Sequence, residues 1–171
     1  MKKIVLLFLL ITFYAKGHTQ NNNNSIETNA IQKELGFEIV FGVYNDDSYN
    51  HTFDAKERKW ILKKGILIYK IDANDVAYAD TIALKKNDIK TIINFVNEQN
   101  LFISINKDLS KGLLNKFGHT ETITAQITYQ NQKANFNLKT NSPSSFYEDV
   151  DANRLKKLED LLYQIVETYK E

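Results

Sequence analysis

The residues best suited to chemistry lie in the segment DDSYNHTFDAKE, residues 46–57, which has the ligand spacing of a calcium-binding loop. An EF-hand loop takes oxygen ligands from its positions 1, 3, 5, 7, 9 and 12. Those positions here hold Asp46, Ser48, Asn50, Thr52, Asp54 and Glu57. The sixth position of such a loop needs glycine, because the backbone turns there with a positive φ, and His51 stands there instead. The segment before the window is typical of a strand and not of a helix. The sequence therefore predicts a solvated acidic loop between strands, with weak calcium binding as the open alternative.

Histidines and serines give no local support for hydrolase chemistry. His51 and His119 are the histidines beyond the first twenty residues, and neither belongs to an H-E-x-x-H or H-x-H pattern. Ser144 or Ser145 could be combined with His119, but the nucleophile patterns G-x-S-x-G and S-x-x-K do not occur. We therefore predict no catalytic residues and interpret these side chains as loop residues.

The clustered carboxylates Glu148, Asp149 and Asp151 have a structural explanation. They stand at the start of the last predicted helix, where the helix macrodipole favours negative charge. The glycines are scattered singly, so no glycine-rich loop could bind phosphates. The chain has no cysteine, which excludes thiolate metal sites, disulfides and thiol catalysis. The sequence thus predicts neither a metal site nor a cofactor.

The region around residues 44–60 is the best candidate binding surface, because it combines a loop position with aromatic and acidic side chains. Trp60 has two interpretations: an aromatic anchor on the surface, or a side chain packed under the edge of the sheet, which we favour. The candidate binding residues are Tyr44, Asp46, Asp47, Tyr49, His51, Phe53, Asp54 and Trp60.

The elements that must position these residues begin with β-rich runs. Residues 36–44 form a predicted strand, and residues 60–71 and 76–84 form a predicted hairpin with a four-residue loop at 72–75. A helix follows, since Ile89, Ile92, Ile93 and Val96 have the spacing of an amphipathic stripe, with Asn87 as the expected N-cap.

A second hairpin and helix follow the same order. Residues 122–130 alternate strictly, residues 133–140 return, and 142–145 are expected to break the chain. The last helix has Asp151 as its expected N-cap and an apolar face that runs to Tyr169. Residues 103–120 have no decisive period and are expected to form a loop with a short helix around 109–117. The predicted fold is α+β: a single antiparallel sheet of about five strands, in two hairpin–helix units, with two helices packed on one face.

The first residues predict export. Lys2 and Lys3 precede an apolar run of eleven residues, which suits a signal peptide, whereas a membrane span needs about 20. We expect residues 1–17 to be a signal peptide, with cleavage before His18 or as late as after residue 20; a retained membrane anchor is the alternative. Residues 18–30 are polar and predict a flexible leader, and residues 31–171 a single domain. Without cysteine the protein is not a lipoprotein, so we expect a periplasmic or secreted protein with no transmembrane segment in its mature chain.

The functional expectation follows from charge and from the missing signatures. The predicted mature chain has a slight excess of acids, so it offers no basic surface for nucleic acid. We expect a small non-enzymatic protein-binding module, inhibitor-like or immunity-like, with a protein partner in the cell envelope. The alternative is a small exported hydrolase or metal-dependent enzyme that uses His51, His119 and nearby acids. A cheap discriminator is the thermal stability of the purified protein with and without calcium or chelator.

Overall fold

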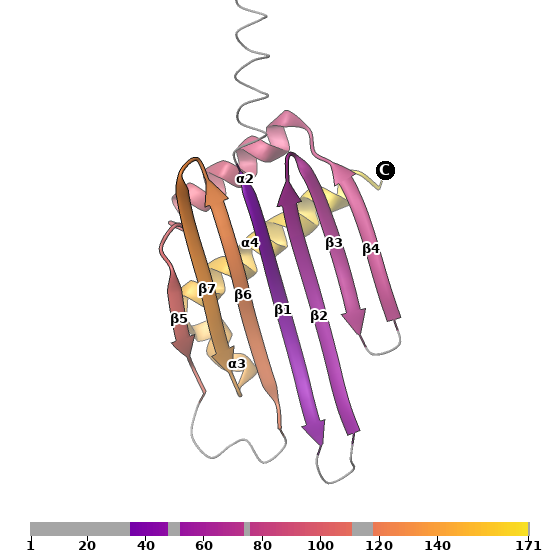
Figure 1. Ribbon diagram of the computed structural model, residues 1–171, viewed down its shortest axis with the longest axis vertical. Helices are drawn as coiled ribbons and strands as arrows, with labels where there is room; N and C mark the ends of the chain where they lie inside the picture. Colours follow the sequence, from indigo (N-terminus) through magenta and orange to yellow (C-terminus); the bar gives the residue numbers. More distant parts are fainter. Residues whose placement is uncertain (1–34, 48–51, 74–75, 111–117, 171) are drawn as a thin grey trace, which may run out of the picture.

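One seven-stranded sheet and three helices make up the described part of the protein (Figure 1). The computed structural model describes residues 35–47, 52–73, 76–110 and 118–170. The strands are β1 (Gly36–Asp47), β2 (Thr52–Lys63), β3 (Ile66–Ala73), β4 (Val76–Ala83), β5 (Ile105–Asp108), β6 (Thr120–Tyr129) and β7 (Gln132–Thr140). The helices are α2 (Lys86–Glu98), α3 (Pro143–Glu148) and α4 (Val150–Glu167).

The strands are ordered β4-β3-β2-β1-β6-β7-β5 across the sheet. All neighbouring strands are antiparallel except β5, which pairs with β7 in parallel. The α+β class is therefore confirmed. The finer prediction of about five strands in a purely antiparallel sheet is not, because the sheet has seven strands and is mixed.

A tight turn at Lys64 and Gly65 explains one of the additional strands. Both residues have a positive φ, 53° and 76° respectively, and they join β2 to β3 with Lys63 paired to Ile66. Two left-handed residues in a row are the geometry of a two-residue hairpin loop. The predicted single strand 60–71 is thus divided between β2 and β3. The usual Asn-Gly signal is replaced here by Lys-Gly, which the sequence analysis interpreted as part of a strand.

The calcium-loop window lies in a β-hairpin. Asp46 and Asp47 end β1, and residues 52–57 belong to β2, with Asp47 opposite Thr52. The strands on both sides show that the backbone is not the helix–loop–helix of an EF-hand. Residues 48–51 lie outside the described residues.

Alternating burial places the core on one face of the sheet. In β6, Ile123 and Ile127 are buried while Thr124 and Gln126 are exposed, and β7 continues the pattern with Phe136 buried. This hairpin was predicted, and its strands and inward face are confirmed. Its turn lies at residues 130–131, where Gln130 has a φ of 53°.

Helix α2 has the predicted buried stripe, Ile89, Ile92, Ile93 and Val96. It begins earlier than expected, with Lys85 and not Asn87 at the N-cap. The reason is a capping bond, since the Asp88 carboxylate accepts a hydrogen bond from the backbone N–H of Lys85 at 3.2 Å.

Helices α3 and α4 replace the predicted break and single helix. Pro143 is the first residue of α3, a position where a helix does not need the missing N–H. Asp149 caps α4 and accepts bonds from the N–H groups of Asp151 and Ala152, so the predicted N-cap is two residues too late.

The segment 103–120 contains a short strand that the sequence analysis did not predict. Strand β5 has four residues, too few for a clear period, and the N–H of Leu109 continues its pairing by donating to the carbonyl of Lys139 at 2.7 Å. Most of the expected helix at 109–117 lies outside the described residues.

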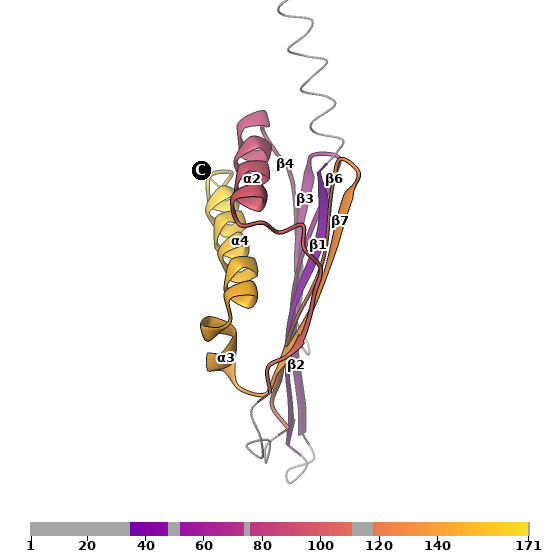
Figure 2. The ribbon, with the colours of Figure 1, turned by 90° about the vertical axis from the view of Figure 1, so that its left-hand side faces the viewer.

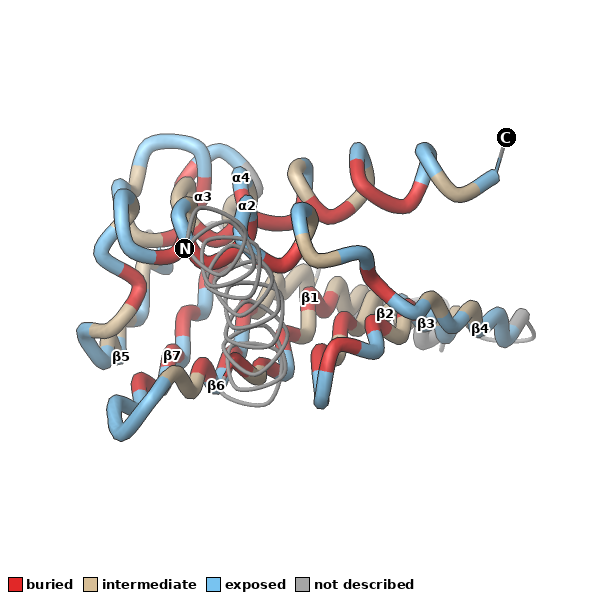
Figure 3. The backbone as a smooth tube through the Cα atoms, turned by 90° about the horizontal axis from the view of Figure 1, so that it is seen from above, coloured by how far each residue is buried: buried red, intermediate tan, exposed pale blue. Residues whose placement is uncertain are grey.

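All three helices pack on the same face of the sheet (Figures 2 and 3). The predicted placement of the helices on one face is confirmed, but three helices lie there where two were predicted. We call this the covered face and the opposite side the open face. Within the described ranges no helix or strand covers the open face. None of the helices there has the length and apolar character needed to cross a membrane.

Candidate functional site

The open face of the sheet is the side that the three helices leave uncovered (Figure 2). Hydroxyl, amide and ammonium groups line its β6–β7 half. They are Thr122, Thr124, Gln126, Thr128, Lys133, Asn135, Asn137 and Lys139, which face away from the helices because their neighbours in sequence face the core. Some of these groups pair with one another: the Gln126 amide donates to Asn135 at 3.2 Å. This half of the open face can donate and accept hydrogen bonds across several strands.

The β1–β3 half of the open face carries aliphatic side chains among charged ones, which include Lys63 and Lys70. We call these residues the apolar stripe: Val40, Ile61, Ile66 and Ile68. Ile61 and Ile68 are directly paired between β2 and β3, and Ile66 is 44% exposed. A salt bridge borders the stripe, with the Lys59 ammonium 2.5 Å from the Glu38 carboxylate. The open face therefore has an aliphatic stripe beside a half that is lined by hydroxyl, amide and ammonium groups.

A shallow groove of about 340 Å³ lies between the two halves. It is lined by Glu38, Val40, Thr124, Ala125, Gln126, Asn135 and Phe136. Glu38 is the one ionisable residue of this lining, and general acid–base catalysis usually needs a second titratable group within reach. The lining suits hydrogen bonding and apolar contact better than proton transfer.

Tyr44 lies on the open face near the far end of the β1–β2 hairpin. Its hydroxyl donates to the Glu57 carboxylate at 2.5 Å. This bond, together with burial, raises the pKa of the Tyr44 phenol above its usual value. The ring lies over Gly42, where a Cβ atom would be only 2.6 Å from the Tyr44 hydroxyl oxygen. The absence of a side chain at Gly42 thus leaves the space that the Tyr44 ring occupies.

The other predicted surface residues are not gathered around Tyr44. Asp54 is exposed on β2, but its register puts it opposite Asn45, and consecutive residues of a strand point to opposite faces. Tyr44, opposite Ala55, is therefore on the other face from Asp54. Tyr49 and His51 lie outside the described residues. The backbones of Asp46, Asp47 and Phe53 belong to the hairpin strands, and their side chains lie outside the description.

Trp60 is fully buried on the covered face, so it is not part of a binding surface in this structure. Its ring stacks on Tyr69 at 4.2 Å between centroids and meets the edge of Tyr163 at 4.9 Å. Its Nε1 donates to the Glu159 carboxylate at 3.3 Å. The packing interpretation of Trp60 is the correct one, although β2 is an inner strand and not an edge of the sheet.

A buried polar cluster on the covered face was missed by the sequence analysis. Glu159 of α4 accepts two hydrogen bonds from the guanidinium of Arg58 on β2, and the hydroxyls of Tyr69 and Tyr163 are 2.7 Å apart beside it. The available signal was the carboxylate of Glu159 on the apolar face of the last predicted helix, because a buried charge needs a partner.

His119 takes part in a polar network at the start of β6. Its Nδ1 is 2.6 Å from the Asn45 side-chain oxygen, and its Nε2 is 3.3 Å from the Glu121 carboxylate. The partners of the His119 ring nitrogens in the described structure are thus Asn45 and Glu121 and not a serine. The Ser144 hydroxyl instead pairs with the Ser142 hydroxyl at 3.1 Å. Among the described residues, no group of three or more histidine, cysteine, aspartate or glutamate side chains could hold a metal ion.

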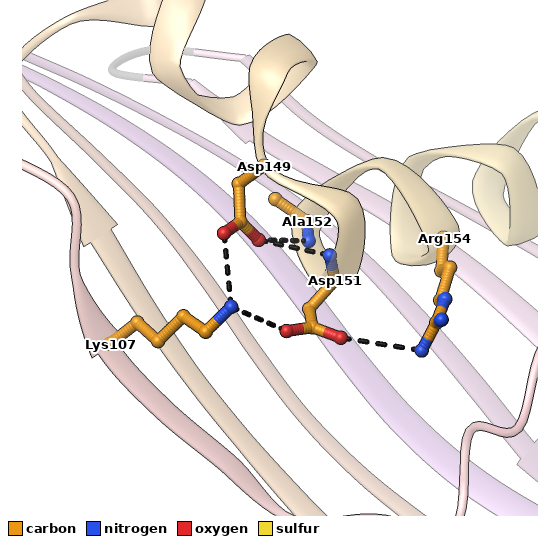
Figure 4. Close-up of polar contacts among 5 residues, drawn as sticks. All are labelled: Lys107, Asp149, Asp151, Ala152 and Arg154. Carbon is orange, nitrogen blue, oxygen red and sulfur yellow. Dashed lines mark hydrogen bonds and ion pairs between the residues drawn. The ribbon is translucent and has the colours of Figure 1, made fainter.

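The carboxylates of Asp149 and Asp151 at the start of α4 bind the side-chain ammonium of Lys107 (Figure 4). The ammonium of Lys107 on β5 lies 3.0 Å from Asp149 and 2.5 Å from Asp151. Arg154 pairs with Asp151 from the other side at 3.3 Å. Burial alone would raise the pKa of Asp149, but bonds from the Ala152 N–H and from Lys107 outweigh it and hold the pKa below its usual value. The cluster fastens the edge strand to the helix.

No protein-family model matches the chain, and no curated protein matches it. The function has to be inferred from the fold and its surfaces.

These surfaces differ in what they can do. The clusters around Glu159 and Lys107 are internal contacts between sheet and helices whose charges are already paired. Within the described residues no helix covers the open face, and it combines aliphatic groups with hydroxyl, amide and ammonium groups. It is the best candidate functional site.

Proposed function

We propose that the protein is a small exported, non-enzymatic protein-binding module, inhibitor-like or immunity-like, which binds its partner with the open face of the sheet. The observation that supports this proposal most strongly is the pairing of the apolar stripe with the polar half of the same uncovered face. Specific interfaces have an apolar centre and a hydrogen-bonding rim.

The open face is also a rigid platform, which lowers the entropy lost on binding. Its strands are fixed from behind by the core, where Trp60, Ile39 and Leu158 are fully buried. A partner with a flat surface, aliphatic at its centre and polar around it, would fit this face. A small-molecule site would need a more enclosed pocket that buries most of its ligand.

Site-specific photo-cross-linking in the native cell tests the proposed surface. A photoreactive amino acid replaces Ile61 or Thr124 on the open face, and the matched controls replace Asn94 of α2 and Gln164 of α4, which are exposed on the helices. We expect one discrete protein adduct from positions 61 and 124 and none from positions 94 and 164. Adducts from the helix positions alone would contradict the proposal.

Export is a separate part of the proposal and rests on the first seventeen residues. Fractionation of cells that express the full chain, with intact-mass measurement of the product, tests it. We expect the protein in the periplasm or medium with a mass that corresponds to a first residue at His18, or shortly after it. A product that keeps residues 1–17 and stays with the membrane would contradict it.

A further inference from the structure

Strand β4 is the last strand on one side of the sheet. It pairs with β3, and no described segment pairs with its other edge. Exposed edge strands are usually protected by charged side chains, especially lysine, by proline, by a bulge or by very short length. The eight residues of β4, VAYADTIA, contain neither lysine nor proline, and they pair continuously with β3 without a bulge. Asp80, opposite Tyr69, is the one charged residue of the strand. The edge is thus suited to pairing with another strand.

The odd-numbered residues of β4 present their backbone groups to this free edge. The N–H of Leu84 donates to the carbonyl of Gly65 in the turn between β2 and β3. In an antiparallel ladder the bonding direction alternates from residue to residue. The even-numbered residues of β4 therefore face β3, and Ala77, Ala79, Thr81 and Ala83 direct N–H and C=O groups outward.

We propose that β4 pairs antiparallel with β4 of a second copy of the chain, in a register centred on Ala79, to form one continuous sheet. In an antiparallel pair, residues opposite each other point to the same face of the sheet. Because the two strands are identical and related by a twofold axis, an odd-numbered residue pairs with an odd-numbered one and an even-numbered residue with an even-numbered one. Centring on Ala79 puts Ala79 opposite Ala79 and Ala77 opposite Thr81. Ala79 has outward backbone groups, so the two copies of Ala79 form a hydrogen-bonded pair. The outward N–H of Thr81 donates to the carboxylate of its own Asp80 at 2.7 Å, so the 77–81 pairs form only when this N–H exchanges that carboxylate for the carbonyl of Ala77 of the second copy.

The side chains distinguish this register from its neighbour. In the register centred on Asp80, the carboxylates of the two copies would stand directly opposite each other, and like charges opposite each other destabilise a strand pair. In the register centred on Ala79, Asp80 is opposite Tyr78 of the second copy. Tyr78 is 48% exposed, and its hydroxyl already reaches the Asp80 carboxylate of its own strand at 3.4 Å. The Tyr78 hydroxyl of one copy can therefore donate to the Asp80 carboxylate of the other copy across the twofold axis.

A groove beside β4 can receive the aromatic side chain. It has a volume of about 300 Å³, and its lining is Asp80, Thr81, Ile82, Ala83, Val166, Tyr169 and Lys170. Tyr78 of the second copy would lie opposite Asp80 on the covered face, at this groove. The second copy would thereby bury an exposed aromatic ring on each side of the interface.

Disulfide trapping tests both the pairing and its register, because the chain has no cysteine of its own. Hydrogen-bonded antiparallel pairs have Cα atoms about 5.5 Å apart, within the usual range of disulfides. In the full-chain protein, Ala79→Cys should form a covalent dimer under mild oxidation. The matched control is Ala77→Cys, which is also exposed but lies opposite residue 81, and it should form no covalent dimer.

A second measurement uses no oxidant. Sedimentation of the full-chain protein should show a reversible dimer, and Ala79→Pro should weaken it by about tenfold or more, since the two central N–H donors are lost. Ala79→Val, which keeps its N–H, should dimerise like the unmodified chain. Equal cross-linking of the two cysteine variants, cross-linking of neither, or a monomer at all concentrations would overturn the proposal.

Discussion

The carboxylate of Glu159 on α4 accepts two hydrogen bonds from the guanidinium of Arg58 on β2, at 3.0 and 3.1 Å. Glu159 is 6% exposed, and a third bond from Trp60 reaches the same carboxylate. Two residues 101 positions apart in sequence thus hold the last helix over the centre of the sheet, which keeps the open face rigid from behind.

Removing one member of this pair should be costly. Glu159→Ala leaves the Arg58 guanidinium and the Trp60 N–H without their acceptor, and we expect a loss of about 3 kcal/mol in the free energy of unfolding. Equilibrium unfolding in urea measures this loss. The double variant Arg58→Met with Glu159→Leu removes both charges and should cost less than Glu159→Ala alone. A double variant that is the less stable of the two would contradict this account of the cluster.

The capping aspartate of α4 should make stability depend on pH in acid. The pKa of Asp149 in the folded protein is lower than its usual value of 3.8, so on acidification the unfolded chain takes up a proton first. The stabilisation from Asp149 is fully present above the unfolded-state pKa and is lost as the pH falls through the folded-state pKa.

Asp149→Asn tests this dependence, because asparagine still caps the helix but does not titrate. We expect the free energy of unfolding to fall less steeply below about pH 4 in the variant than in the unmodified protein. Asp160→Asn, at an exposed position of α4, is the control for the change in net charge. An unchanged acid slope in Asp149→Asn would show that the contacts of Asp149 do not favour its charged form.

Substitutions at the two residues of the turn between β2 and β3 should change the stability of the protein in opposite directions. Gly65→Ala should destabilise the protein by about 1–2 kcal/mol, because the residue has a φ of 76° that a Cβ atom disfavours. Lys64→Asn should stabilise it by about 0.5 kcal/mol, since asparagine adopts a positive φ more readily than lysine. Thermal unfolding measures both changes, with Lys63→Ala in the adjoining strand as control. A less stable Lys64→Asn would mean that the turn has another geometry.

The periodic parts of the fold were predictable from the sequence. The alternation in β6 and β7 predicts a sheet with one apolar face, and the spacing of Ile89 to Val96 predicts a helix with one apolar face. These two faces are buried when the helix packs on the sheet. The class of the fold and the placement of the helices on one face follow from those patterns.

The parts that the sequence did not reveal depend on single residues or on distant pairing. The positive φ of Lys64 divides a run that is β-rich throughout. Strand β5 is too short to show a period and forms because β7 offers it an edge. The position of Asp54 opposite Asn45 depends on register, which composition does not specify.

The candidate site was predictable only in part for the same reason. A loop rich in aromatic and acidic residues attracts attention in a sequence, and Tyr44 does lie on the open face. The apolar stripe does not stand out, because Val40, Ile61 and Ile68 come from three strands and look like core residues in each. Only the packing of all helices on the other face makes them a surface.

The affinity of the cross-linked partner for two charge variants tests the central claim most directly. Ile61→Asp places a charge within the apolar stripe, and Gln164→Asp makes the same addition on an exposed position of α4. With folding checked by circular dichroism, we predict that the dissociation constant rises by about tenfold or more for Ile61→Asp. Gln164→Asp should bind like the unmodified protein. Unchanged affinity in Ile61→Asp would contradict the claim that the open face binds the partner.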